Sequence, residues 1–83
     1  MTRTQTTYHR TRMLAGHPID PRGPNCETIE LARHTAIAGP ETAIIKTDWR
    51  LGGDGAWHET TSVIVEIKTI SGGTIHASDG GNV

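Results

Sequence analysis

The sequence predicts a small α+β protein in which one short helix packs on an antiparallel β-meander. From 41 to 77, apolar and polar residues alternate in three runs, as in strands that have one buried and one solvated face. Glycine-rich breaks at 52–55 and 72–73 separate these runs, as turns would. Between 25 and 39 the apolar spacing instead fits a helix, which a Gly-Pro pair would close.

The first part of the chain is expected to lie at the periphery of the domain, outside its core segment. We predict one domain over 1–83, with a basic, proline-containing arm or loop at 1–24, a core at 25–77 and a frayed tail at 78–83. The threonines from Thr4 to Leu14 favour an edge strand or an ordered arm. The prolines that follow favour an extended, polyproline-like connector.

The helix prediction rests on its expected start and on one apolar face. Asn25 is a good N-cap residue, and acidic residues follow it within the first turns. The apolar stripe that would face the sheet consists of Cys26, Ile29, Ala32, Ala36 and Ile37. The alternative is an all-β protein with 26–37 as a strand, because β-branched residues are frequent there and Ile29 and Leu31 alternate with Glu30.

The three alternating runs predict both the buried face and the strand pairing. Odd-numbered residues from Ala43 to Ala77 would face the core, which leaves Ile44, Ile64 and Ile70 on the outer face. Three-residue loops at 52–54 and 71–73 would keep this parity across the turns. The cross-strand pairs they predict are Trp49 with Trp57, Asp48 with His58, Ile67 with Ala77 and Lys68 with His76.

Composition narrows the classes of function. Leu, Ile and Val total 15 residues and Phe is absent, so the core is small, and we expect support from a homodimer or from a partner. One cysteine cannot form an intramolecular disulfide, and no run of about 18 apolar residues suggests a membrane span. No catalytic, phosphate or metal signature stands out, so we expect no enzyme activity and no cofactor, in a cytoplasmic setting.

These features predict a non-enzymatic protein-binding module. In profile, the short, acidic-bodied, motif-free chain resembles phage or mobile-element accessory proteins, including the anti-CRISPR inhibitors. That resemblance implies a steric blocker of a host protein or nucleoprotein complex, but it carries no motif and assigns no residue. The expected contact residues lie on the outer strand face: Lys46, Asp48, Arg50, His58, Ile64, Glu66 and Ile70.

Two alternatives remain open from the sequence. Residues 1–22 hold four arginines against one acidic residue, whereas 23–83 hold four basic against eight acidic residues. A nucleic-acid-binding accessory protein would use that basic arm, whose arginines are Arg3, Arg10, Arg12 and Arg22. A structural homodimer would instead use the outer strand face for self-association.

Overall fold

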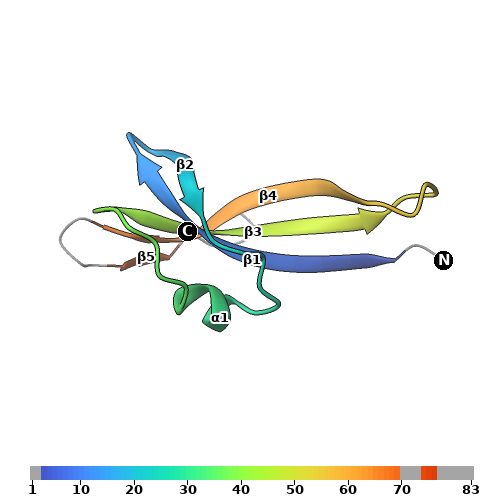
Figure 1. Cartoon of the computed structure of the whole chain (residues 1–83), viewed down its shortest axis with the longest axis horizontal. Helices are drawn as coiled ribbons and strands as arrows, with labels where there is room; N and C mark the ends of the chain where they lie inside the picture. Colours follow the sequence, from blue (N-terminus) through green and yellow to red (C-terminus); the bar gives the residue numbers. More distant parts are fainter. Residues whose placement is uncertain (1–2, 70–73, 77–83) are drawn as a thin grey trace.

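The structure is a computed structural model that describes residues 3–69 and 74–76 (Figure 1). In this part of the chain, five antiparallel strands form one sheet in the order β2-β1-β3-β4-β5, with one short helix beside it. The elements are β1 (Thr4–Leu14), β2 (His17–Arg22), α1 (Ile29–Arg33), β3 (Thr42–Leu51), β4 (Trp57–Lys68) and β5 (Thr74–His76). The predicted small antiparallel sheet with a short helix is confirmed, and the first part of the chain adds β1 and β2 to it.

The expectation that the N-terminal part is an arm or an edge strand is wrong. Strand β1 lies between β2 and β3 and pairs with β3 from Thr4 to Arg12. The turn that follows uses positive φ at Ala15 (52°) and Gly16 (81°), which returns the chain as β2. The expected polyproline-like connector is therefore this strand, and its prolines are tolerated because β2 is an edge strand.

Strands β1, β3 and β4 place their side chains in cross-strand rows. We call the side covered by α1 the helix face, and the other side the back face. The helix-face rows are Thr4–Arg50–His58, Thr6–Asp48–Thr61, Tyr8–Lys46–Val63, Arg10–Ile44–Glu66 and Arg12–Thr42–Lys68. The back-face rows are Gln5–Trp49–Glu59, Thr7–Thr47–Ser62, His9–Ile45–Ile64 and Thr11–Ala43–Ile67.

Two irregularities in β4 overturn the simple parity of the predicted faces. The register with β3 skips Thr60 and Val65, so each is an extra residue of a β-bulge. Because a one-residue shift exchanges the two faces, odd-numbered Val63 lies on the helix face, where it is 38% exposed. Val65, at the second bulge, is buried.

The core lies mainly under the helix. Ile44 is 3% exposed and clusters with Ala32 and Val65, so the prediction that Ile44 is an outer residue is wrong. The partly buried residues that pack against this cluster are Tyr8, Cys26 and Ile29. The back face of β3 is also buried at three predicted core positions, which are Ala43, Ile45 and Thr47. The middle of β3 is therefore covered on both sides.

The helix is shorter than predicted because tertiary contacts hold its flanks in other conformations. It is capped by Thr28, not Asn25, and the Thr28 hydroxyl accepts a hydrogen bond from the Leu31 amide at 3.2 Å. Before it, Cys26 forms a β-bridge with Tyr8. After it, the predicted stripe residues Ala36 and Ile37 lie outside the helix. The alternative strand over 26–37 is not observed, although five strands and one five-residue helix bring the described residues close to an all-β fold.

The predicted strand pairs at both turns also differ from those observed. The β3–β4 loop spans 52–56, so Trp57 pairs with Leu51, and His58 pairs with Arg50. The loop closes with a 2.8 Å hydrogen bond from the Gly52 amide to the Ala56 carbonyl. The observed pairs between β4 and β5 are Glu66 with His76, Ile67 with Ile75 and Lys68 with Thr74. The predicted turn at 71–73, Ala77 and the tail lie outside the described residues.

Candidate binding surface

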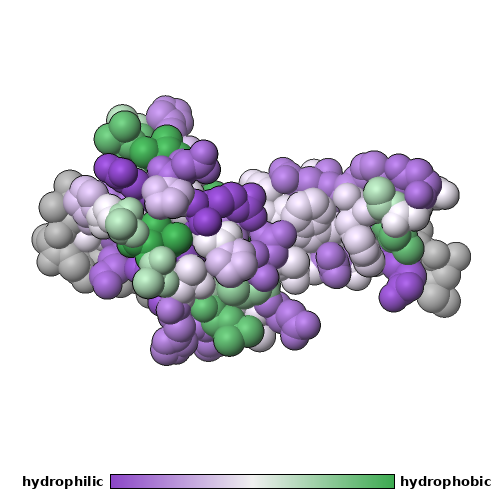
Figure 2. Space-filling view, in the orientation of Figure 1, coloured by the Kyte–Doolittle hydropathy of each residue, from purple (hydrophilic) through white to green (hydrophobic). Residues whose placement is uncertain are grey.

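Helix α1 covers only one end of the helix face. The rows of Thr42 and Ile44 lie at this end, and three further rows continue toward the β3–β4 turn; the first of these contains Tyr8, which still packs partly against the cluster under α1. We call those three rows the open patch; its residues are Thr4, Thr6, Tyr8, Lys46, Asp48, Arg50, His58, Thr61 and Val63. In the view of Figure 2, hydrophilic and near-neutral residues dominate the extended end of the molecule. Polar groups therefore decide what this end can bind.

Asp48 occupies the centre of the open patch and is held from both neighbouring strands. Its carboxylate accepts hydrogen bonds from the Thr6 hydroxyl at 2.7 Å and the Thr61 hydroxyl at 2.9 Å. These two hydrogen bonds, Thr6 first, hold the pKa of Asp48 below its ordinary value. The Thr60 hydroxyl also donates to the Asp48 carbonyl at 3.1 Å. The patch thus carries a negative charge in a fixed position.

His58 contacts the β3–β4 turn. The predicted pairing of His58 with Asp48 is therefore wrong. Its Nε2 lies 3.1 Å from the Asp54 carboxylate. The Ala56 amide and then His58 lower the pKa of Asp54. A Cβ atom on Gly52 would lie 2.6 Å from Asp54 Oδ1 and 2.8 Å from His58 Nε2, so a larger residue there would displace these two side chains from their present contact. Asp48 and His58 stand in adjacent rows and form no acid–base pair.

The structure brings together four of the seven predicted contact residues. Lys46, Asp48, Arg50 and His58 all belong to the open patch. Ile64 pairs with Ile45 and so lies on the back face, because the second bulge changes the parity. The remaining two are Glu66, beside α1, and Ile70, which lies outside the described residues.

Sequence reasoning missed the residues that complete the patch from neighbouring strands. Thr6 and Tyr8 come from β1, whose place beside β3 no local pattern indicates. Val63 was assigned to the core by its parity. The sequence signal for β1 is its threonine content, as at Thr4 and Thr6. It indicates a strand but does not indicate the position of that strand in the sheet.

The four arginines of the nucleic-acid alternative do not form one surface. Arg10 and Arg12 lie in the rows nearest α1, Arg22 pairs with Thr11 of the back-face rows, and Arg3 precedes the far end of β1. Arg22 also donates to the Asn25 side chain at 2.6 Å. A phosphate backbone needs a continuous basic track, which this distribution does not supply.

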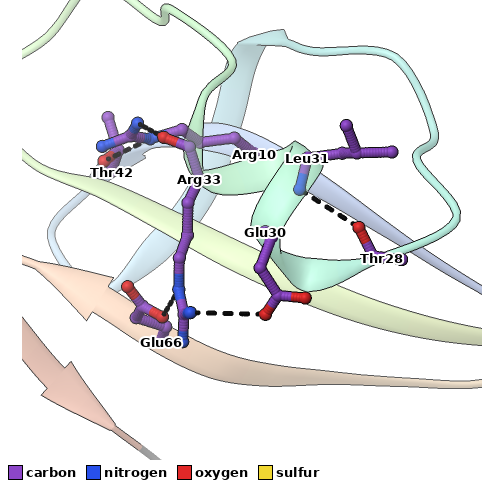
Figure 3. Close-up of polar contacts among 7 residues, drawn as sticks. All are labelled: Arg10, Thr28, Glu30, Leu31, Arg33, Thr42 and Glu66. Atoms are coloured by element: carbon purple, nitrogen blue, oxygen red, sulfur yellow. Dashed lines mark hydrogen bonds and ion pairs between the residues drawn. The ribbon is translucent and has the colours of Figure 1, made fainter.

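Arg10 has a structural role at the end of α1 (Figure 3). Its Nε donates to the Thr42 hydroxyl at 3.1 Å, and its Nη1 donates to the carbonyls of Arg33 at 2.9 Å and Thr35 at 3.1 Å. These carbonyls lie at and just beyond the last turn, where no helical amide follows to satisfy them. Arg10 thereby joins β1, β3 and the end of the helix.

His9 is a buried titratable group on the back face. The residue is 7% exposed, and its Nδ1 atom has no hydrogen-bond partner among the described residues. A pocket of about 330 Å³ separates it from β2. Burial, and secondarily the charge of Arg22, lower the pKa of His9 below 6.5, although Glu59 opposes this shift. Protonation of His9 therefore disfavours the folded state.

We expect stability to fall as the pH is lowered below about 6.5, because the unfolded chain then binds more protons at His9 than the folded chain. The stabilisation that neutral His9 contributes to the folded state is complete above pH 6.5. It is lost progressively as the pH falls toward the lowered pKa of His9 in the folded chain. Thermal unfolding between pH 8 and pH 5, in steps of about half a unit, measures it. His9→Phe should flatten this dependence, whereas His17→Gln, on exposed β2, should retain it. A slope equal to wild type in His9→Phe would contradict the assignment.

Comparison of the chain with known protein families, curated proteins and solved structures gave no match. Among the described residues, no helix is long and apolar enough to cross a membrane. Function is therefore inferred from the geometry of this chain alone.

Proposed function

We propose that the chain is a non-enzymatic protein-binding module that blocks a host macromolecular complex in the cytoplasm stoichiometrically, with the open patch as its contact surface. The observation that carries the proposal is the fixed carboxylate of Asp48, held by Thr6 and Thr61 on an exposed part of the sheet. A side chain ordered before binding loses less conformational entropy when a partner docks. Such a surface suits recognition by shape and charge.

The composition around Asp48 also fits a protein interface. Lys46 and Arg50 lie in the rows on either side of it, so charges of both signs stand within one short stretch. Val63 exposes 38% of its surface in the row of Tyr8 and supplies an apolar contact. Apolar anchors surrounded by complementary charges are common in protein interfaces, with aromatic and arginine side chains enriched.

As a contact surface, the open patch is favoured over the edge of β4. From Trp57 to Ile64, this edge has no partner strand among the described residues. The bulges at Thr60 and Val65 interrupt the ladder between β3 and β4, and bulges of this kind hinder the pairing of a further strand at an edge. Edge-to-edge assembly of two copies is thus disfavoured.

The test is a titration of the complex captured from host lysate by the tagged chain after nuclease treatment. The purified complex should bind the chain in a saturable, stoichiometric manner and lose its activity in proportion to occupancy. Arg50→Gln should weaken binding about tenfold, while Gln5→Ala, at the same end of the back face, should leave it unchanged. Inactivation by substoichiometric chain would indicate catalysis and reject the proposal, as would equal effects of the two variants.

A further inference from the structure

A small pocket lies beside α1, outside the open patch. It has a volume of about 180 Å³ and is lined by Arg10, Arg33, Thr42, Ala43, Ile44, Glu66 and Lys68. We call it the basic pocket. Figure 3 shows the Arg33 side chain extending from α1 to Glu66 on β4, while Arg10 reaches the end of the helix from the other side. The pocket is therefore built by three strands and the helix.

The charges around this pocket are unbalanced. Three cationic side chains, Arg10, Arg33 and Lys68, line it together with one carboxylate, that of Glu66. Glu66 accepts a 2.8 Å hydrogen bond from Arg33 Nε, and its side chain is only 12% exposed. Glu30, 3.6 Å from Arg33 Nη1, is the second acid nearby. The lining alone has an excess of two positive charges.

Donors in and beside the pocket remain without an acceptor among the described residues. Arg10 uses Nε and Nη1 but not Nη2 for its hydrogen bonds, and the Lys68 ammonium makes none. In the row of Thr42 and Lys68, Arg12 has a buried Nε–H with no hydrogen-bond partner. Arg12 does not line the pocket, but Arg10 and Lys68 do, so an anionic acceptor entering the pocket would gain charge-assisted hydrogen bonds from these two side chains.

We propose that the basic pocket binds one carboxylate, supplied by an acidic side chain of the protein partner. This inference rests on the proposed function and adds the chemistry of the partner. A carboxylate fits because guanidinium groups bind its planar pair of oxygens and because the pocket has room for a single small group. Nucleic acid fits less well, since Arg3, Arg22 and Arg50 lie on other parts of the sheet and do not continue the pocket as a track along a repeating backbone.

The first test uses glutarate as the probe, at constant ionic strength, followed by NMR of the arginine side-chain N–H groups and backbone amides. Glutarate should give saturable shifts at Arg10 and Arg33. Lys68→Gln should weaken binding about fivefold, because Lys68 is exposed and its charge is partly screened. Arg3→Gln removes an exposed cation outside both the pocket and the open patch and should leave glutarate binding unchanged. Absence of saturation, or equal weakening by both variants, would overturn the site.

The second test separates this inference from the proposed function. Lys68→Gln should lower the affinity of the chain both for the captured partner and for glutarate. Glutarate should also compete with that partner for binding. Unchanged partner affinity in Lys68→Gln overturns the inference while the open patch and the blocking role stand. If no partner binds the wild-type chain although glutarate does, the proposed function fails and the assignment to a partner's side chain fails with it. Displacement of glutarate by a DNA duplex, but not by the partner, would also overturn it.

Discussion

Ile44→Ala is expected to lower the free energy of unfolding by about 3 kcal/mol. Ile44 is 3% exposed and packs against Ala32 and Val65, so truncation removes apolar contacts and leaves a cavity under the helix. A domain of this size has a stability of only about 5 kcal/mol, so much of the chain should lose its cooperative transition. Urea unfolding followed by tryptophan fluorescence and by circular dichroism measures the loss.

Val63→Ala is the matched control for this prediction. Val63 lies on the same face of the sheet but is 38% exposed, so its truncation should cost less than about 1 kcal/mol. The alternation in the sequence predicts the opposite order, with Val63 inside and Ile44 outside. A larger loss for Val63→Ala would therefore place the core on the odd-numbered face and contradict the packing of α1.

Arg10→Met should also be strongly destabilising, by about 3 kcal/mol. The substitution keeps an apolar stem of similar length but removes hydrogen bonds to the Thr42 hydroxyl and to the carbonyls of Arg33 and Thr35. Those carbonyls would remain unpaired next to the partly buried end of the helix. Denaturant unfolding gives the stability change, and amide hydrogen exchange near Thr35 should show the local loss of protection.

Arg50→Met provides the comparison for Arg10. Both residues lie on the helix face, but Arg50 is exposed in the open patch, so its replacement should change stability by less than about 0.5 kcal/mol. Equal stability of the two variants would show that Arg10 does not hold the helix end. The result also bears on the nucleic-acid alternative, because binding lost in an Arg10 variant has meaning only when folding is intact.

Short-range patterns predicted much of the sheet. The alternation from Thr42 to Leu51 identified β3 closely, and it placed Ala43, Ile45 and Thr47 correctly in the interior. The apolar stripe predicted for the helix is confirmed at Ala32, which is fully buried. The prediction fails after Arg33, where the chain leaves the helix and the Arg10 guanidinium donates to the carbonyls of Arg33 and Thr35. That contact joins residues 23 positions apart, which no local pattern can include.

The candidate surface was predictable only along one strand. Lys46, Asp48 and Arg50 share a face because side chains alternate with a period of two, and this holds wherever the strand lies. Their neighbours depend on pairing across the sheet. Thr6 comes from a strand expected to be peripheral, and Ile64 moved to the back face through a bulge that has no clear sequence signal.

The local features of this protein follow from the order of its amino acids: the strand-forming alternation, the glycine-rich break after β3 and one apolar turn of helix. The tertiary structure decided which face is buried, since α1 covers the even-numbered side at Ile44 and β2 meets the other side, where the Thr11 hydroxyl donates to the Ile19 carbonyl at 2.8 Å. It also decided the register through the bulges at Thr60 and Val65. The difference arises because backbone propensities act over only a few residues. Burial and register, in contrast, follow from the summed pairing of the entire sheet.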